Sequence, residues 1–174
     1  MGADTFTKDR PLMATLRPAR AGDLPAVNGV IQRAIGTWRL TPRVKRLAVP
    51  LYCYRETDLT ALELTVAERA GEVVAVAAWE PAAAQDLPSG QRGLLLHGLY
   101  VDPAWQGRGL GRLLLYRACA AAGEAGFDGV LVKAQAEAAA FFAAAGCRLL
   151  PVQDPARDYP HRYWCAPAAG CPGG

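Results

Sequence analysis

The residues best suited to chemistry lie in one short segment, where glycines alternate with charged or apolar residues. Gly107, Gly109 and Gly111 open an apolar run without proline, and Arg108 and Arg112 stand among them. Backbone N–H groups at the start of a helix lack intrahelical partners, and the helix dipole adds partial positive charge there. Glycines let a ligand approach those N–H groups closely, and the arginines add full charges. The segment predicts an anion site, and the ligand we expect is a pyrophosphate.

Two familiar phosphate-binding loops do not fit this segment. A Walker loop needs Lys-Ser/Thr after its last glycine, whereas Arg112-Leu113 follows here. The dinucleotide fingerprint needs Gly-x-Gly-x-x-Gly, whereas the spacing here is Gly-x-Gly-x-Gly. The remaining alternative to an anion site is a glycine-rich turn that binds no ligand.

The second chemical candidate is His97, which lies within an apolar run from Leu94 to Val101. Such a run, closed by Asp102-Pro103, is typical of a buried strand. An imidazole with an ordinary pKa near 6.5 can take a proton from an amine near neutral pH. His97 is therefore our candidate general base, and a core histidine hydrogen-bonded to the backbone is the alternative.

The elements around these residues form one unit. The apolar strand is followed by a helix from Leu110 to Ala125, which Gly126 ends, and by a second buried strand, residues 129–133. A strand, a helix and a second buried strand predict a βαβ crossover, in which the two strands run parallel with the helix packed across them.

This stretch resembles the acyl-CoA-binding motif of the GNAT superfamily of N-acyltransferases. That motif runs from an apolar strand through Val-x-Pro to Gln/Arg-x-x-Gly-x-Gly/Ala at the start of a helix. Val101-Asp102-Pro103 and Gln106-Gly107-Arg108-Gly109-Leu110-Gly111 match it position for position. The resemblance implies that the turn binds the pyrophosphate of acetyl-CoA and that the pantetheine arm lies where the two parallel strands splay apart.

The resemblance also assigns roles around the thioester. The backbone N–H of Leu99 would stabilise the oxyanion, and the backbone of Val101 would hold the pantetheine amide. Family members often protonate the departing CoA thiolate with a tyrosine, but this chain has Phe142 at that position. Phe142 cannot donate a proton. Either Tyr163 or Tyr100 takes the role, or the thiol, with an ordinary pKa of about 8.5, leaves without help.

Two overlapping sets of site residues follow from the residues and the resemblance together. The expected catalytic residues are His97, Leu99 and Tyr163. The residues expected to contact acetyl-CoA are Leu99, Tyr100, Val101, Gln106, Gly107, Arg108, Gly109, Leu110, Gly111, Arg112, Gln135 and Phe142.

The order of the remaining elements fits the same family. The resemblance implies a mixed α+β fold with a mostly antiparallel sheet of about seven strands, one parallel βαβ crossover at the CoA site, and helices on both faces. Outside the crossover we expect an edge strand at 15–18, a helix at 23–36, a short helix within 43–51, a hairpin of 62–68 and 73–80, a helix at 136–145, and strands at 147–150 and 161–164.

Length and composition limit the classes of function. The 174 residues suit one domain, and we expect residues 15–166 to form a single N-acetyltransferase domain between disordered ends at 1–14 and 167–174. A net charge of +3 is too small to indicate nucleic-acid binding. Apolar runs stay below the roughly 18 residues of a membrane span, and the start of the chain lacks the apolar core of a signal peptide. We expect a cytoplasmic protein with no membrane partner.

The five cysteines, at 53, 119, 147, 165 and 171, show neither CxxC pairs nor zinc-finger spacing. We interpret them mostly as small buried apolar residues, and predict no metal and no structural disulfide. Oxidation of Cys165 with Cys171, near the end of the chain, is the alternative.

The function that these features indicate is acetyl transfer from acetyl-CoA to an amine, directly and in a ternary complex, because the central strand carries no cysteine for an acyl-enzyme. The alternative is a catalytically idle acyl-CoA-binding sensor or partner module. We expect a small-molecule acceptor rather than a protein, and a monomer or homodimer. The acceptor would carry an anionic group, recognised by basic residues of an irregular segment that also holds three aromatics: Arg39, Arg43, Lys45 and Arg46. A solvated charge run is the alternative for those four.

Overall fold

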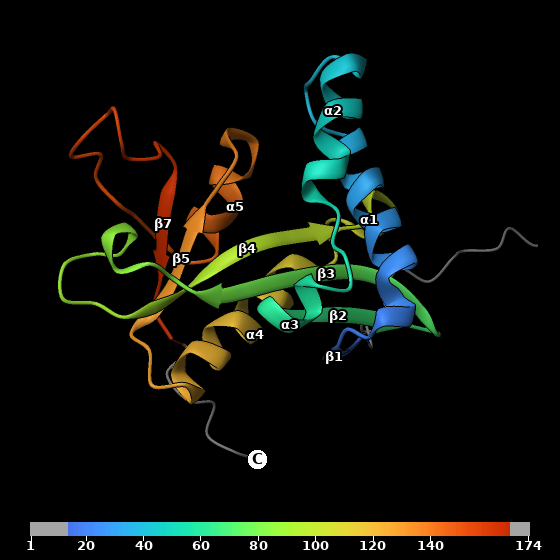
Figure 1. The fold of residues 1–174 in the computed structure, drawn as a ribbon, viewed down its shortest axis with the longest axis horizontal. Coiled ribbons are helices and arrows are strands. Elements are labelled where there is room, and N and C mark those ends of the chain that lie inside the picture. Colours follow the sequence, from blue (N-terminus) through green and yellow to red (C-terminus); the bar gives the residue numbers. More distant parts are fainter. Residues whose placement is uncertain (1–13, 168–174) are drawn as a thin grey trace, which may run out of the picture.

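A computed structural model describes residues 14–167 of the chain. Within that range the protein forms one seven-stranded sheet with helices on both faces (Figure 1). The strand order is β1-β2-β3-β4-β5-β7-β6, and β4 and β5 form the parallel pair of an otherwise antiparallel sheet. The predicted mixed fold with one parallel crossover is therefore confirmed. The ends expected to be disordered, 1–14 and 167–174, lie outside the described residues except for Ala14 and Pro167.

The strands are β1 (Thr15–Pro18), β2 (Glu63–Arg69), β3 (Glu72–Pro81), β4 (Gly93–Val101), β5 (Gly129–Lys133), β6 (Arg148–Leu149) and β7 (Arg162–Cys165). The helices are α1 (Leu24–Gly36), α2 (Pro42–Tyr52), α3 (Asp58–Ala61), α4 (Leu110–Glu124) and α5 (Ala139–Ala144). The predicted helix at 136–145 divides into a 3-10 turn, Ala136–Ala138, and α5. The short helix α3 is a feature that the sequence pattern did not predict.

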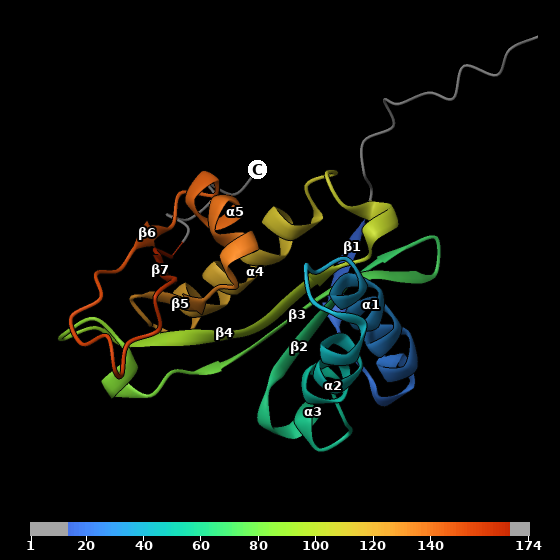
Figure 2. The same ribbon diagram turned by 90° about the horizontal axis from the view of Figure 1, so that it is seen from above.

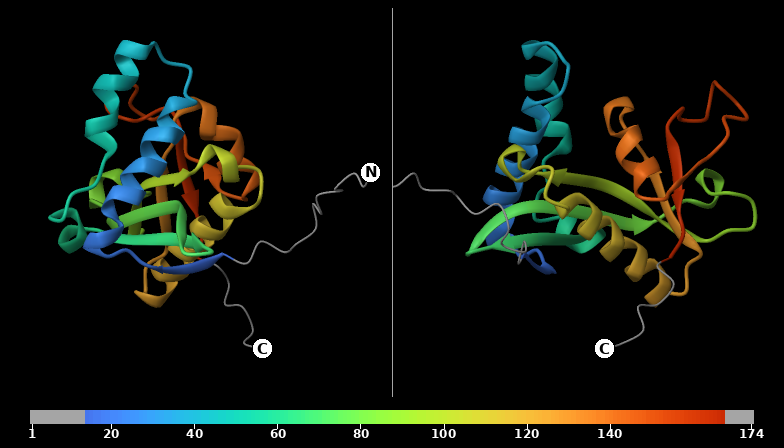
Figure 3. Two further views of the ribbon diagram at one scale, coloured as in Figure 1. Left: turned by 90° about the vertical axis from the view of Figure 1, so that its right-hand side faces the viewer. Right: turned by 180° about the vertical axis from the view of Figure 1, so that it is seen from behind.

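Two apolar cores hold the layers together. On one face, α1 buries its predicted stripe, including Val27, Val30 and Ile31, against β2, β3 and β4. On the other face, α4 and α5 share a core that includes Leu114 and Phe142. Figures 2 and 3 show the α1–α3 group and the α4–α5 group on opposite sides of β4. The central strand is therefore covered by helices on both sides.

The parallel pairing of β4 with β5 is short, and this opens the sheet. The two strands pair only from Gly93 with Gly129 to Leu96 with Val132. Beyond that point β5 ends at Lys133, while β4 continues to Val101 alongside β3. The far half of β4 is thus free to face a ligand on the side that β5 has left.

A disulfide joins Cys147 to Cys165, so the prediction of no structural disulfide is wrong. The antiparallel pairing of β6 with β7 sets Arg148 opposite Trp164, which brings the neighbouring cysteines to a Cα–Cα distance of 4.4 Å. Cys171, the partner considered for Cys165, lies outside the described residues. Spacing along the chain gave no sign of this pair because the register of β6 against β7 creates it.

Candidate active site

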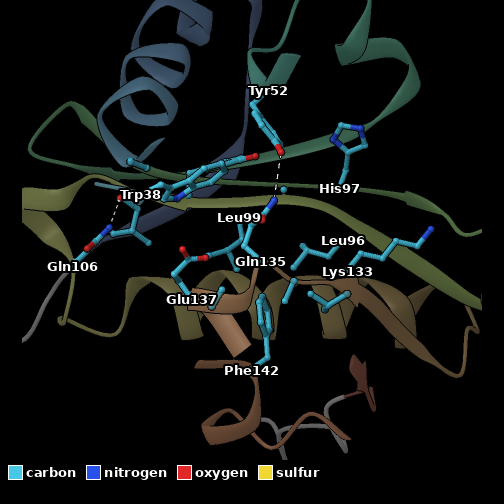
Figure 4. Close-up of a pocket in the computed structure, with 17 residues that line it drawn as sticks. Trp38, Tyr52, Leu96, His97, Leu99, Gln106, Lys133, Gln135, Glu137 and Phe142 are labelled. Atoms are coloured by element: carbon cyan, nitrogen blue, oxygen red, sulfur yellow. Dashed lines mark hydrogen bonds between the residues drawn. The ribbon is translucent and has the colours of Figure 1, made fainter. Parts of the chain in front are cut away.

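A cavity of about 280 Å³ opens where β4 and β5 separate (Figure 4). Its walls come from β4, the end of β5 and α5. Two aromatic residues complete them: Trp38, which precedes α2, and Tyr52, which ends it. Seven of the predicted site residues line this cavity: His97, Leu99, Tyr100, Val101, Gln106, Gln135 and Phe142. The structure therefore brings together the candidate base, the backbone of β4 and part of the predicted acetyl-CoA set.

His97 occupies a β-bulge. The register of β3 against β4 shifts here, because Ala78 is opposite Gly98 whereas Trp79 is opposite Leu96. A bulge inserts one extra residue and redirects its side chain, and bulges are common beside active sites. The side chain of His97 is exposed and lines the cavity. This placement contradicts the alternative of a core histidine.

The Nδ1 atom of His97 shares a hydrogen bond of 3.3 Å with the hydroxyl of Tyr54. Tyr54 is only 4% exposed, and burial raises the pKa of its hydroxyl, which therefore stays protonated at neutral pH. Two hydrogen bonds between the Asn28 side chain and the Tyr54 backbone, of 2.8 and 2.9 Å, fix Tyr54 in place. A Cβ atom at Gly98 would lie 2.6 Å from the Tyr54 hydroxyl, so only glycine fits beside this pair.

The glycine turn at the start of α4 has the open backbone that an anion site needs. Gly109 is the N-cap of α4 with a φ of 83°, and Gly107 has a φ of 72°, both in the left-handed region that favours glycine. A Cβ atom built at either position would meet no described atom within 4 Å. Gly111 differs, because its Cβ would lie 3.2 Å from the Phe141 ring. Gly111 therefore allows α5 to pack on α4, while the other two glycines leave space for a ligand.

The other residues of the turn make contacts within the protein. The side-chain amide of Gln106 donates a hydrogen bond of 3.2 Å to the Val101 carbonyl (Figure 4). The guanidinium of Arg108 lies 4.8 Å from the centre of the Trp105 ring. Arg112 donates a hydrogen bond of 3.1 Å to the Ala144 carbonyl and so links α4 to α5. The side chain of Leu110 is buried in the core, so it can offer a ligand only its backbone.

The α5 wall of the cavity is apolar at Phe142, the position where the family often has a proton-donating tyrosine. The ring of Phe142 lines the cavity and stacks on Tyr163, with centroids 5.9 Å apart. Tyr163 is 5% exposed and lies behind Phe142. From the opposite wall, the hydroxyl of Tyr52 accepts a hydrogen bond of 3.4 Å from the Gln135 amide, across the cavity. Neither Tyr52 nor Tyr54 was among the predicted site residues, although both belong to the irregular segment whose basic residues were expected to recognise the acceptor.

The part of the chain that forms this site matches a known protein family. Residues 61–146, which include β4, the glycine turn and α4, match the family model for the acetyltransferase (GNAT) domain. This match places residues 61–146 in the GNAT superfamily. No curated protein matches the chain. Membership of this family supports acyl transfer as the general activity.

Solved structures share the GNAT fold at low sequence identity. A GNAT family acetyltransferase from Brucella melitensis in complex with acetyl-CoA is 21% identical, with a TM-score of 0.60 and 92% of each chain covered. The N-acetyltransferase YhbS from Escherichia coli in complex with CoA is 21% identical, with a TM-score of 0.64, covering 93% of this chain and 86% of that one. A variant of the AtaT toxin bound to the C-terminus of the antitoxin AtaR is 16% identical, with a TM-score of 0.58, covering 88% of this chain and 91% of that one.

Among residues 14–167, no group of three or more His, Cys, Asp or Glu side chains is placed to hold a metal ion. In the same range, every helix is too short or too polar to cross a membrane.

Proposed function

We propose that residues 15–166 transfer an acetyl group from acetyl-CoA to an amine, directly and within a ternary complex. The observation that carries this proposal is the early end of β5, which exposes the far half of β4 to a cavity that begins beside the glycine turn. A pantetheine arm needs such an extended, unpaired backbone edge, and its pyrophosphate needs free N–H groups at a helix start. Both features lie along one path, with Gln106 between them.

In this proposal, acetyl-CoA binds along β4 and ends at the start of α4. The backbone N–H groups at Gly109 to Gly111, together with the side chain of Arg108, bind the pyrophosphate, and the backbone of Leu99 and Val101 holds the thioester end. The complexes of similar GNAT structures with acetyl-CoA and with CoA support this choice of donor.

In the proposed chemistry, two residues of β4 have separate roles. His97 takes the proton of the acceptor ammonium, which a free amine must lose before it attacks a thioester. The backbone N–H of Leu99 stabilises the negative charge that develops on the carbonyl oxygen. No cysteine among residues 14–167 lines the cavity, which supports direct attack by the amine over an acyl-enzyme intermediate.

For the acceptor we propose a small amine that carries an anionic group. Arg39, Arg43 and Arg46 are exposed in α2 and the turn before it. Helix α2 lies on the opposite side of β4 from α5 (Figure 2). Lys45 is less available, because its ammonium donates a hydrogen bond of 2.6 Å to the Gly36 carbonyl at the end of α1. We propose a monomer or homodimer. A protein partner, as for the similar AtaT toxin with its antitoxin, is the other class to test.

Calorimetry with acetyl-CoA, followed by a thiol-release assay over a panel of amines, tests the proposal. The expected result is binding of acetyl-CoA and amine-dependent release of CoA. The alternative, an idle acyl-CoA-binding module, is favoured by Phe142 at the position where the family often has a tyrosine. Binding without CoA release across amino-acid-like, polyamine, antibiotic-like and peptide amines would support the module and contradict the enzyme.

A further inference from the structure

The proposed reaction produces a CoA thiolate, and the predicted donors of its proton are poorly placed. Phe142 has no proton to give, and Tyr163 lies buried behind it. Tyr100 lines the cavity but is 8% exposed, and burial raises the pKa of its hydroxyl. A better-placed proton donor would have to come from another wall of the cavity.

Tyr52 reaches the cavity from the wall opposite Phe142. It is the last residue of α2, and its ring is held edge-on against Trp38 and Tyr100, with centroid distances of 5.4 and 6.5 Å. Its hydroxyl accepts the 3.4 Å hydrogen bond from Gln135. In Figure 4 the Tyr52 side chain points from the α2 side towards Gln135, and Leu99 lies beside this contact. The phenol oxygen thus lies in the gap that the thioester would occupy.

We propose that Tyr52 is the general acid that protonates the departing CoA thiolate, in place of the tyrosine that Phe142 replaces. This inference rests on the proposed acetyl transfer. The amine nitrogen forms a bond to the thioester carbon as His97 removes the amine proton, and the carbon–sulfur bond then breaks. The sulfur takes the Tyr52 hydroxyl proton. The resulting phenolate regains a proton from solvent. His97 passes to solvent first the proton of the ammonium and then the proton of the attacking amine, so a turnover that starts from an ammonium releases one proton overall.

The other ionisable side chains that line the cavity are less suited to the role. His97 already serves the amine in this scheme. The ammonium of Lys133 lies 3.2 Å from a carboxylate oxygen of Asp86. Asp86 is not part of the cavity lining, so this ion pair holds the Lys133 charge away from the thioester. Glu137 is exposed, and an ionised carboxylate only accepts hydrogen bonds. Tyr52 combines a proton that it can donate with a ring that its neighbours hold in place.

The test uses CoA itself and needs no knowledge of the acceptor. Tyr52→Phe keeps the ring contacts with Trp38 and Tyr100 and removes only the hydroxyl. A hydroxyl that hydrogen-bonds a thiolate stabilises the charged form, so the bound thiol should ionise at a pH higher by about one unit in the variant. The ultraviolet absorbance of the thiolate, followed during a pH titration of the CoA complex, measures this shift. With an active amine, kcat should also fall about tenfold while KM for acetyl-CoA stays within about twofold.

Tyr116→Phe is the matched control, because Tyr116 is exposed on α4 outside the cavity lining. It should titrate and turn over like the wild type. Circular dichroism checks that each variant is folded. If CoA binds and the thiol titrates identically in wild type and Tyr52→Phe, Tyr52 is not the acid, while the proposed function stands. If the wild type does not bind CoA, the proposed function and the Tyr52 assignment both fail.

Discussion

At the scale of single residues, the surroundings of His97 show what its position in the sequence could not. The sequence singled out His97 because it places in the central apolar strand an imidazole that can take a proton from an amine near neutral pH. The bulge explains how its side chain escapes burial. Its partner Tyr54 and the nearby Tyr52 gave no such signal. Both lie in a segment without periodicity, and their place beside the cavity depends on how α2 packs against α1 and on the contacts of Asn28.

Replacing the candidate base gives the first prediction. His97→Ala should lower turnover about 10²–10⁴-fold, which is the usual contribution of a positioned base, with acetyl-CoA affinity nearly unchanged. The wild-type rate at limiting acceptor should rise with pH as the imidazole loses its proton and then level off, and the variant should lose this rise. Stopped-flow or steady-state thiol release across pH measures both.

His161→Ala is the control, because His161 lies in the loop before β7 and outside the cavity lining. It should keep the wild-type rate and pH profile. The base assignment would be wrong if folded His97→Ala turned over at the wild-type rate with the same profile.

At the scale of elements, the sequence predicted what depends on local patterns. Hydrophobic periodicity and helix-ending glycines located α1, α4, the β2–β3 hairpin and the crossover within a few residues. No local sequence pattern shows over how many residues β4 and β5 pair. The resemblance therefore implied that the two strands separate, but it could not show where. The Cys147–Cys165 disulfide was missed for the same reason, since β6 has only two residues and its register is set by β7.

The glycine turn gives the second prediction. Gly109→Ala should weaken CoA binding at least tenfold, because the added Cβ projects into the space left for the pyrophosphate and strains a left-handed backbone. Gly126→Ala is a matched control at the other end of α4, with a φ of 71° and no described atom within 4 Å of its Cβ. Gly126→Ala places alanine in the same left-handed backbone conformation but away from the site, so this variant should bind CoA normally by calorimetry. Equal loss in both variants would place the phosphates elsewhere.

The disulfide gives the third prediction. Its cysteines are separated by 18 residues, and closing a loop of this size contributes on the order of 2–4 kcal/mol to the free energy of unfolding. A variant with both Cys147 and Cys165 changed to alanine should lose about this much in chemical denaturation. Dithiothreitol should lower the stability of the wild type and of a Cys53→Ala control, but not that of the double variant. A wild type insensitive to reductant would show that this disulfide does not stabilise the fold.

At the scale of the whole molecule, the two walls of the cavity differ in how their residues are spread along the sequence. The wall that we propose faces CoA comes from a contiguous motif, and the sequence predicted several of the residues that line it. The opposite wall brings Trp38 and Tyr52 towards β4, across tens of residues of sequence. We propose that the residues that select the acceptor and the one that protonates the thiolate belong to this second wall. Tyr52 could not be assigned from the sequence, because its place in the cavity depends on tertiary packing.

A half-buried charge cluster joins the edge of the sheet to the start of α1 and gives the fourth prediction. Arg17 of β1 lies 2.7 Å from carboxylate oxygens of both Asp23 and Glu68, and the hydrogen bond from Arg17 lowers the pKa of Asp23 to about 2. A lowered pKa in the folded state stabilises the protein above pH 4 and ceases to do so as the pH falls through about 2. Asp23→Asn should therefore cost about 1–2 kcal/mol at pH 7, after allowance for solvent screening, and much less near pH 2.

Denaturation curves at the two pH values measure this difference. Glu124→Gln is the control, because Glu124 is 66% exposed and its pair with Arg117 should contribute little. A cost of Asp23→Asn that did not change between the two pH values would contradict a charge-based role.

The central claim is direct acetyl transfer from acetyl-CoA within the cavity between β4 and β5. The most direct measurement mixes the protein with acetyl-CoA carrying an isotope-labelled acetyl group and a panel of amines, and follows both protein and amine masses during the first turnover. We expect the label to appear on an amine and never on the protein, and we expect Gly109→Ala to slow its transfer at low acetyl-CoA. Label trapped on a cysteine, or acetyl-CoA bound without any labelled amine, would contradict the central claim.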